Sequence, residues 1–188
     1  ARDDKVLASW NGLMLGAFAE AGAALDEPRY LDAARRNAAF LRDRLWDPAT
    51  CTLHHRWRDG RRDDVQLLTA HAFPLAGLID LYETALDPGS LAFAVEIGEA
   101  MIERFADPVA GGFWQRGGEA ADMIARVKDD QDGAEPAGGS VAALALLRLA
   151  AITGREQFRS VAEHAIAFHA GRLRAAPHTL PHLLLARS

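Results

Sequence analysis

A segment of about 60 residues occurs twice in succession in this chain, and this repeat limits the folds that the chain can form. Pro28 and Pro88 lie 60 positions apart. Other matching positions share that offset: Leu31 and Leu91, Leu41 and Met101, Leu45 and Phe105, Asp47-Pro48 and Asp107-Pro108, Leu53 and Phe113, and Asp3-Asp4 and Asp63-Asp64. A third copy follows a longer insertion, with Asp129-Asp130 as its acid pair and Phe158 in place of Leu91. Such repeats indicate units that stack because none can bury its apolar face alone.

Each copy is predicted to contain two helices. Apolar residues recur at helical spacing in six segments, at about residues 9–25, 28–45, 67–86, 88–105, 136–151 and 156–173. Ser9 is expected to cap the first helix, and Gly154 is a suitable residue to end the fifth. The alternating segment 52–57, followed by Asp59-Gly60, predicts a short β-hairpin. The tail from Pro177 has no clear pattern.

The first, third and fifth helices are the more uniformly apolar, so we expect them to form an inner layer with the other three outside. This predicts an all-α fold in which three helical hairpins form part of a toroid or solenoid. Gly12 and Gly16 lie inside the first helix, where each glycine is unfavourable by about 1 kcal/mol relative to alanine. We therefore expect a neighbouring backbone to approach closely there. Each acidic loop precedes an inner helix, so the three loops should share one rim.

Composition and charge argue against several functional classes. The 188 residues, 1–188, are expected to form a single domain, and the formal net charge of −5 without a basic stripe argues against nucleic acid as a partner. The longest uncharged apolar run ends at Arg148 and is too short to cross a membrane. Cys51 is the only cysteine, so we expect no internal disulfide, no metal–thiolate cluster and a cytoplasmic location. No metal or cofactor is expected. Because the first residue is Ala1, we expect a piece of a longer protein.

The acid-rich loop at residues 128–140 contains the strongest candidates for chemistry, because four carboxylates lead directly into the most apolar helix. Paired carboxylates act as acid, base or nucleophile in glycoside-processing sites. Asp129, Asp130 and Glu135 are therefore candidate catalytic residues. Two residues of the loop are candidate contacts for a substrate: Lys128 and Asp132. The alternative is structural, because acids also cap helix N-termini, match the helix dipole and pair with nearby basic residues.

Four further side chains are candidates for substrate binding. Trp10 and Asn11 stand at the start of the first inner helix, where an indole suits stacking on a sugar face and an amide suits hydrogen bonding to hydroxyl groups. Trp114 lies on a segment that could fold over the rim, and His71 lies just inside the third helix. Each has a structural alternative, because Trp usually packs against a core and a lone His is usually a satisfied structural group.

Two long motifs resemble one known protein family. They are Asp-Asp-Lys-Val-Leu-Ala-Ser-Trp-Asn-Gly-Leu-Met at 3–14 and Lys-Asp-Asp-Gln-Asp-Gly-Ala-Glu-Pro-Ala-Gly-Gly-Ser-Val-Ala at 128–142. Both are similar to the spermatogenesis-associated, thioredoxin-domain-containing proteins and their bacterial relatives. In that family a thioredoxin-like domain precedes a helical toroid of the six-hairpin glycosidase type, and this chain has no Cys-x-x-Cys. The resemblance implies three helical hairpins forming a segment of an (α/α)6 toroid, similar to sugar epimerases and glycosidases.

One stretch departs from the family pattern. Relatives usually open the third inner helix with Asp-Tyr-Ala, whereas this chain has Thr69-Ala70-His71-Ala72, and Gly139 replaces an amide of the acidic motif. Our first hypothesis is a carbohydrate-binding or carbohydrate-processing domain with an acidic rim, glycosidase-like or epimerase-like if it is an enzyme. The alternative is a non-catalytic protein-interaction module whose exposed inner helices associate with a second copy or with the rest of the toroid.

Overall fold

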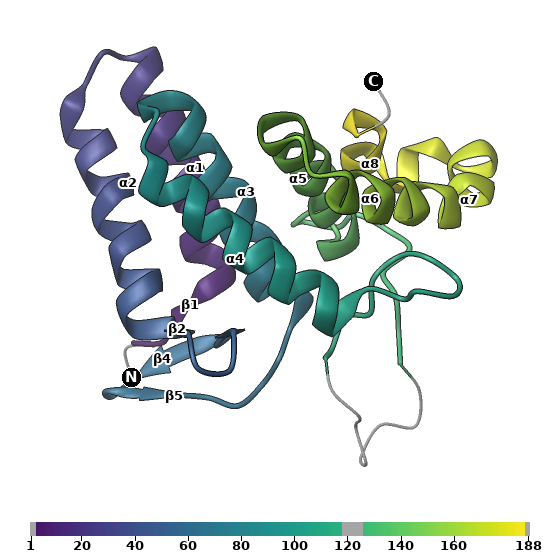
Figure 1. Cartoon of the computed structure of the whole chain (residues 1–188), viewed down its shortest axis with the longest axis horizontal. Coiled ribbons are helices and arrows are strands. Elements are labelled where there is room, and N and C mark those ends of the chain that lie inside the picture. The colour runs from purple at the N-terminus through teal and green to yellow at the C-terminus, as the bar shows by residue number, and fades with distance from the viewer. Residues whose placement is uncertain (1–2, 118–125, 187–188) are drawn as a thin grey trace.

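The structure, a computed structural model, describes residues 3–117 and 126–186 and consists mainly of helices (Figure 1). The six long helices are α1 (Ala8–Ala24), α2 (Pro28–Phe40), α3 (Leu68–Ala85), α4 (Pro88–Phe105), α5 (Gly138–Thr153) and α6 (Glu156–Phe168). A π-helical turn at Leu41–Leu45 extends α2, and the chain ends with α7 (Ala170–Ala175), a 3-10 turn (Pro177–Thr179) and α8 (Pro181–Leu185). The prediction of an all-α fold built from three helical hairpins is confirmed.

The described residues form five very short strands. β1 (Val6–Leu7) precedes α1, and the other four lie between the first two hairpins: β2 (Trp46–Asp47), β3 (Thr52–Leu53), β4 (Arg56–Arg58) and β5 (Arg61–Arg62). Strand β4 lies between β1 and β5 in one antiparallel sheet, and β2 pairs with β3. Asp59 and Gly60 have positive φ angles in the turn between β4 and β5, as a two-residue hairpin requires. The predicted hairpin is present as β4 and β5, while the first part of the segment 52–57 forms β3, which pairs with β2.

The internal repeat recurs in the backbone hydrogen bonds. The Ala8 N–H donates to the His55 carbonyl at 2.9 Å. At equivalent positions of the second copy, the Leu68 N–H donates to the Gln115 carbonyl at 2.9 Å. Two antiparallel bridges repeat in the same way: Trp46 with Leu53, and Ala106 with Phe113. In both copies, the first residue of the inner helix is therefore bonded to the loop that follows the outer helix.

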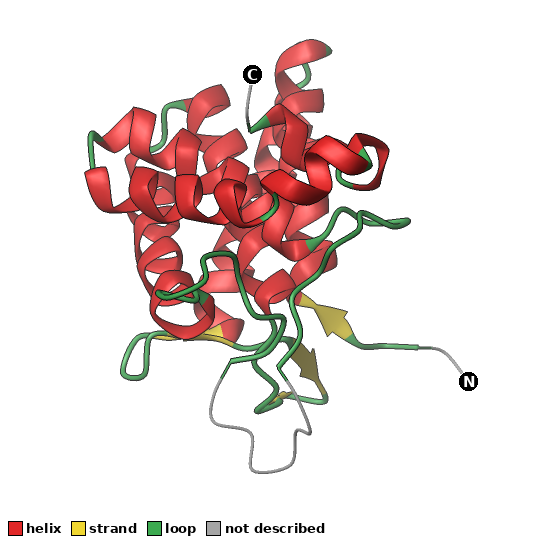
Figure 2. Cartoon of the chain, turned by 90° about the vertical axis from the view of Figure 1, so that its right-hand side faces the viewer, coloured by secondary structure: helices red, strands yellow, loops and turns green. Residues whose placement is uncertain are grey.

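The helices form two layers, with α1, α3 and α5 inside and α2, α4 and α6 outside, as predicted (Figures 1 and 2). Helix α3 packs against both α1 and α5, and its crossing with α1 is made by glycines. A Cβ at Gly77 would lie 2.4 Å from the Gly12 carbonyl oxygen, and a Cβ at Gly12 would lie 2.3 Å from the Pro74 nitrogen. No side chain fits at these positions, so close backbone packing offsets the low helix propensity of glycine.

The ends of some elements differ from the prediction. Ser9 is buried inside α1 and does not cap it, because the N-cap position is Leu7 and the first helical N–H is bonded to the β3–β4 segment instead. The sixth predicted helix is interrupted at His169, which separates α6 from α7. The tail forms α8, which packs against α5.

The core lies between the two layers of helices. Its largest fully buried side chains are Phe73, Phe93, Phe105 and Phe158. Within residues 3–117 and 126–186, no helix has the length and the apolar composition needed to span a membrane.

The strands and the long loops gather on one side of the molecule (Figure 2), and β1 leads directly into α1. Gly138, at the start of α5, packs against Leu68 and Thr69 at the start of α3. The start of α1 is joined to the loop before α5 by a hydrogen bond from Trp10 to Glu135. The expected common rim is therefore present.

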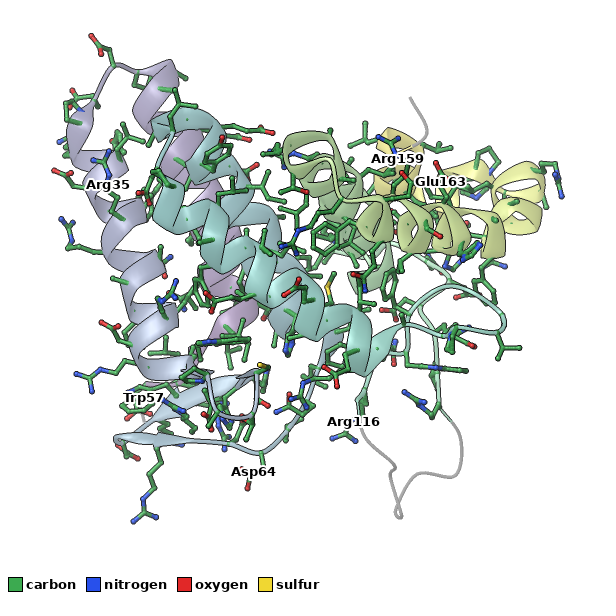
Figure 3. All side chains as sticks on the ribbon, in the orientation of Figure 1. Arg35, Trp57, Asp64, Arg116, Arg159 and Glu163 are labelled. Atoms are coloured by element: carbon green, nitrogen blue, oxygen red, sulfur yellow. The ribbon has the colours of Figure 1, made fainter. Side chains whose placement is uncertain are left out.

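The first two acid pairs of this rim make mainly local contacts. The Asp4 carboxylate lies 2.8 Å from the Arg58 guanidinium. Asp63 accepts a hydrogen bond from the Arg56 N–H at 3.1 Å and also lies 3.6 Å from the Arg56 side chain. Asp64 is exposed and points away from the helices (Figure 3). These acids fit the structural alternative better than a role in a shared binding site.

We expect Gly77→Ala to lower the free energy of unfolding by about 1–3 kcal/mol, because its Cβ would overlap the α1 backbone. Chemical denaturation of the wild type and the variant measures this difference. Gly171→Ala is the control, because nothing lies within 4 Å of the Cβ added there, and it should be neutral or slightly stabilising. If both variants had the same stability as the wild type, the close α1–α3 contact would not exist in solution.

Candidate functional site

The loop that precedes α5 brings one candidate acid next to a candidate aromatic residue. The indole N–H of Trp10 donates to Glu135 Oε1 at 2.8 Å, although the two residues are 125 positions apart. Both side chains are exposed, and Trp10 retains 58% of its accessible surface. This pair combines an open aromatic face with a carboxylate that has a further oxygen available for hydrogen bonds, which are the two features that suit a sugar ring.

Asp132 organises the loop from within. Its carboxylate accepts hydrogen bonds from the Ala137 N–H and from the His182 N–H, each at 2.8 Å. Its own N–H donates to the Thr179 carbonyl at 2.7 Å. Both carboxylate oxygens are therefore used to fix the start of α5 and the start of α8. The structure places Asp132 as an anchor of the loop.

Asp129 and Asp130 lie on the same loop but point to different partners. Asp129 accepts a hydrogen bond from the side-chain amide of Gln115. The Asp130 carboxylate lies 3.2 Å from the guanidinium of Arg172, and its side chain is 70% exposed. These two acids are therefore not gathered with Glu135 into one cluster of interacting carboxylates.

Lys128 is buried beneath the loop and does not face solvent. Its ammonium group lies 2.7 Å from the Asp107 carboxylate. It also lies over two aromatic rings, 4.3 Å from the centre of Trp114 and 4.2 Å from the centre of Phe168. The hydrogen bond from Lys128, together with two backbone N–H donors, lowers the pKa of Asp107 to about 2. Lys128 and Trp114 thus form an anchor that ties the loop to the end of α4.

Asn11 and His71 occupy equivalent positions in the first two copies and make the same kind of contact. The Asn11 side-chain amide donates to the Leu7 carbonyl at 2.8 Å. The imidazole of His71 lies 3.2 Å from the Leu67 carbonyl and accepts a hydrogen bond from the Leu53 N–H at 3.4 Å. His71 is fully buried, and this burial lowers its pKa to about 4. The structure therefore buries His71 in the core at the start of α3.

A groove runs along the inner helices, and its lining includes Pro136, which follows Glu135, and Leu13, which lies one helical turn after Trp10. Its volume is about 410 Å³, which lies in the range of small-molecule sites. It begins near Pro136 and Leu13, and its walls come from α1, α3, α5 and α8. The residues that line it are Gly12, Leu13, Gly16, Ala17, Glu20, Phe73, Ala76, Gly77, Asp80, Pro136, Val141, Leu144, Ala145, Arg148 and His182.

Charged side chains lie at the end of the groove that is farther from Trp10. One nitrogen of the Arg148 guanidinium lies 2.7 Å from Asp80 and 2.7 Å from Glu83. Burial raises the pKa of Asp80, with smaller contributions from Glu20 and Glu83, while Arg148 opposes the rise. The groove therefore has largely apolar walls and a polar inner end, as ligand sites often do.

Sequence reasoning missed Glu20, Asp80 and Arg148. A signal was present, because Asp80 and Arg148 are isolated charges inside otherwise apolar stretches of the third and fifth helices. Such charges are rarely buried without a partner. No periodicity, however, indicates which charges meet. Within the two described ranges, no three or more Cys, His, Asp or Glu side chains lie together as metal ligands would.

Comparison with known proteins gives the evolutionary context. Spermatogenesis-associated protein 20 from mouse is 35% identical over 191 residues, covering 97% of this chain, and the human protein is 34% identical over 195 residues, covering 99%. The family resemblance is confirmed. The chain spans about a quarter of the length of these relatives. No protein-family model matches the chain.

Solved structures share the fold of this chain. Cellobiose 2-epimerase from Spirochaeta thermophila aligns with a TM-score of 0.70 and 21% identity, over 88% of this chain and 43% of its own. A family 76 α-mannanase from Bacteroides thetaiotaomicron aligns with a TM-score of 0.71 and 15% identity, over 91% of this chain and 46% of its own. A family 105 glycoside hydrolase from C. acetobutylicum aligns with a TM-score of 0.72 and 13% identity, over 87% of this chain and 48% of its own. The three hairpins thus form a segment of an (α/α)6 toroid.

We expect Asp132→Ala to lower the free energy of unfolding by about 2 kcal/mol, because it leaves two backbone N–H groups without their carboxylate acceptor. Hydrogen exchange should show faster exchange of the Ala137 and His182 amides. Asp130→Asn is the control, because an exposed ion pair contributes less than about 1 kcal/mol. Unchanged protection of the His182 amide in Asp132→Ala would contradict the anchoring role.

We expect the buried His71 to make stability depend on pH. The unfolded chain binds a proton near pH 6.5, whereas the folded protein does so only near pH 4. The free energy of unfolding should therefore fall as the pH drops from about 6.5 to 4, by about 3 kcal/mol from this residue. Burial also lowers the pKa of His55, His169 and His182, which adds to the slope.

Denaturation curves of His71→Gln between pH 4 and pH 7 isolate the part that belongs to His71. The variant should show a shallower dependence on pH than the wild type, whatever its absolute stability. The exposed residue His178 provides the matched control, and His178→Gln should keep the wild-type slope. Equal slopes in all three proteins would contradict the assignment.

Proposed function

We propose that this domain binds carbohydrate at the rim, with the ligand entering the groove beside Trp10 and Glu135. The observation that carries the proposal is the exposed Trp10–Glu135 pair, which lies close in sequence to Leu13 and Pro136, two residues that line the groove. The indole offers a face for stacking on the apolar side of a sugar ring, and the carboxylate accepts hydrogen bonds from hydroxyl groups. The same fold occurs in a cellobiose epimerase, an α-mannanase and a glycoside hydrolase, which supports this class of ligand.

The three candidate catalytic acids have different roles in this proposal. Glu135 meets the ligand directly, because it is exposed and faces the side of Trp10. Asp129 and Asp130 hold the loop through Gln115 and Arg172. If the domain catalyses a reaction on the bound sugar, Glu135 is the carboxylate that we assign to proton transfer.

The test is binding of a panel of sugars, including cellobiose and mannose, measured by calorimetry or by chemical-shift changes in NMR spectra. We expect at least one sugar to bind the wild type, and Trp10→Ala to weaken its binding roughly tenfold or more, because the stacking surface is lost. Trp10→Phe keeps an aromatic face without the N–H, so its affinity for the sugar should lie between those of the wild type and Trp10→Ala. Glu135→Gln should weaken binding by losing the charged acceptor.

Glu163→Gln is the matched control for the acid substitution, because Glu163 is exposed on α6 and does not line the groove (Figure 3). It should bind the sugar as the wild type does. The proposal fails if no sugar in the panel binds, or if Trp10→Ala binds the same sugar with unchanged affinity.

A further inference from the structure

The inner end of the groove has a distinctive balance of charges. The Arg148 guanidinium pairs with two carboxylates, those of Asp80 and Glu83, and a third carboxylate, that of Glu20, lines the groove together with Asp80 and Arg148. Arg148 is shared between Asp80 and Glu83 through one nitrogen atom. In residues 3–117 and 126–186, Glu20 has neither an ion-pair partner nor a side-chain hydrogen bond, although it lines the groove. Among these four side chains, one positive charge therefore accompanies three negative charges.

The position of Asp80 depends on a glycine of the facing helix. A Cβ at position 16 would lie 2.4 Å from Asp80 Oδ2, so a larger residue there would force this carboxylate to move. The Asp80 side chain is still 18% exposed. Glu20 lies one helical turn after Gly16 on α1 and reaches the same end of the groove. Two carboxylates from different helices therefore border one space.

A group that fills this space should carry positive charge and donate hydrogen bonds. A divalent metal ion is a poor fit, because it needs more oxygen ligands than these two carboxylates supply and the guanidinium of Arg148 lies beside them. A protonated amine is a better fit, because it has three N–H donors and one compact positive charge. Along α1, Leu13 lies about 10 Å from Glu20 and Trp10 about 15 Å from it, since they are seven and ten residues away.

We propose that the groove takes a carbohydrate that carries a protonated amine, with the amine between Glu20 and Asp80 and the remaining sugar extending towards Trp10 and Glu135. This inference rests on the proposed carbohydrate function and names the class of sugar as an amino sugar. The apolar wall between the two ends, which includes Leu13, Ala17 and Leu144, contacts the less polar faces of the ligand.

Three disaccharides with the same β-1,4 linkage provide the test: cellobiose, the disaccharide of glucosamine, and its di-N-acetylated form. They differ mainly in whether a hydroxyl, an ammonium or an uncharged amide occupies the same ring positions. Affinities are measured by calorimetry at a pH at which the amines are protonated, and NMR shifts of the Gly16 and Gly77 amides report on the inner end. We expect the glucosamine disaccharide to bind at least tenfold more tightly than the other two.

Glu20→Gln tests whether the inner end causes this preference. Glu20 is exposed and makes no ion pair within the described residues, so the fold should not depend on its charge. The variant should reduce the preference for the amine to less than threefold, and the control Glu163→Gln should retain the full preference.

The outcomes separate this inference from the proposed function. If all three disaccharides bind equally, or if Glu20→Gln keeps the full preference, the amine site is wrong while carbohydrate binding stands. If the amine is preferred without any shift of the Gly16 and Gly77 amides, the site is also wrong. If none of the three disaccharides binds but a neutral sugar of the wider panel does, only the amine inference fails. If no sugar binds at all, both proposals fail.

Discussion

The close contact between the backbones of α1 and α3 is the interaction on which the rest of the structure depends. Gly12 and Gly77 allow the two helices to touch without intervening side chains, and Gly16 leaves room for the carboxylate of Asp80. Because side chains are absent from this contact, the groove beside it is narrow and can be bordered by groups from both helices. The glycines therefore determine both the packing of the inner layer and the shape of the groove.

The position of the rim is determined by the contacts that hold the start of each inner helix. In the first two copies, the inner helix begins with a hydrogen bond to the loop that follows its own outer helix. The loop before α5 is held differently, by the buried Lys128, which pairs with Asp107 and stacks on Trp114 and Phe168. A buried ammonium group needs such compensation, because an unpaired charge in the interior is strongly unfavourable. The third copy thus reaches the same rim by a side-chain anchor.

Much of the fold follows from the sequence, because the repeat and the helical periodicity are local or regular signals. They predict the six long helices, the two layers and the common rim. The partners of the individual acids do not follow, since Asp132 meets His182 and Trp10 meets Glu135 only after the helices have packed. The tertiary contacts of His71 could not be predicted either, although its equivalence to Asn11 is visible in the 60-residue offset.

The density of acids in a loop is a poor guide to which acid can bind a ligand, and hydrogen-bonding capacity is a better one. Asp132 uses both carboxylate oxygens on backbone N–H groups, so recruiting it would break the anchor of α5 and α8. Glu135 accepts one hydrogen bond from an exposed indole, and this bond can be exchanged for one to a ligand without disturbing a helix. Glu20 has no such bond to lose. The carboxylates best suited to binding are therefore those that the fold leaves incompletely satisfied; of these two, Glu20 lines the groove and Glu135 immediately precedes its lining residue Pro136.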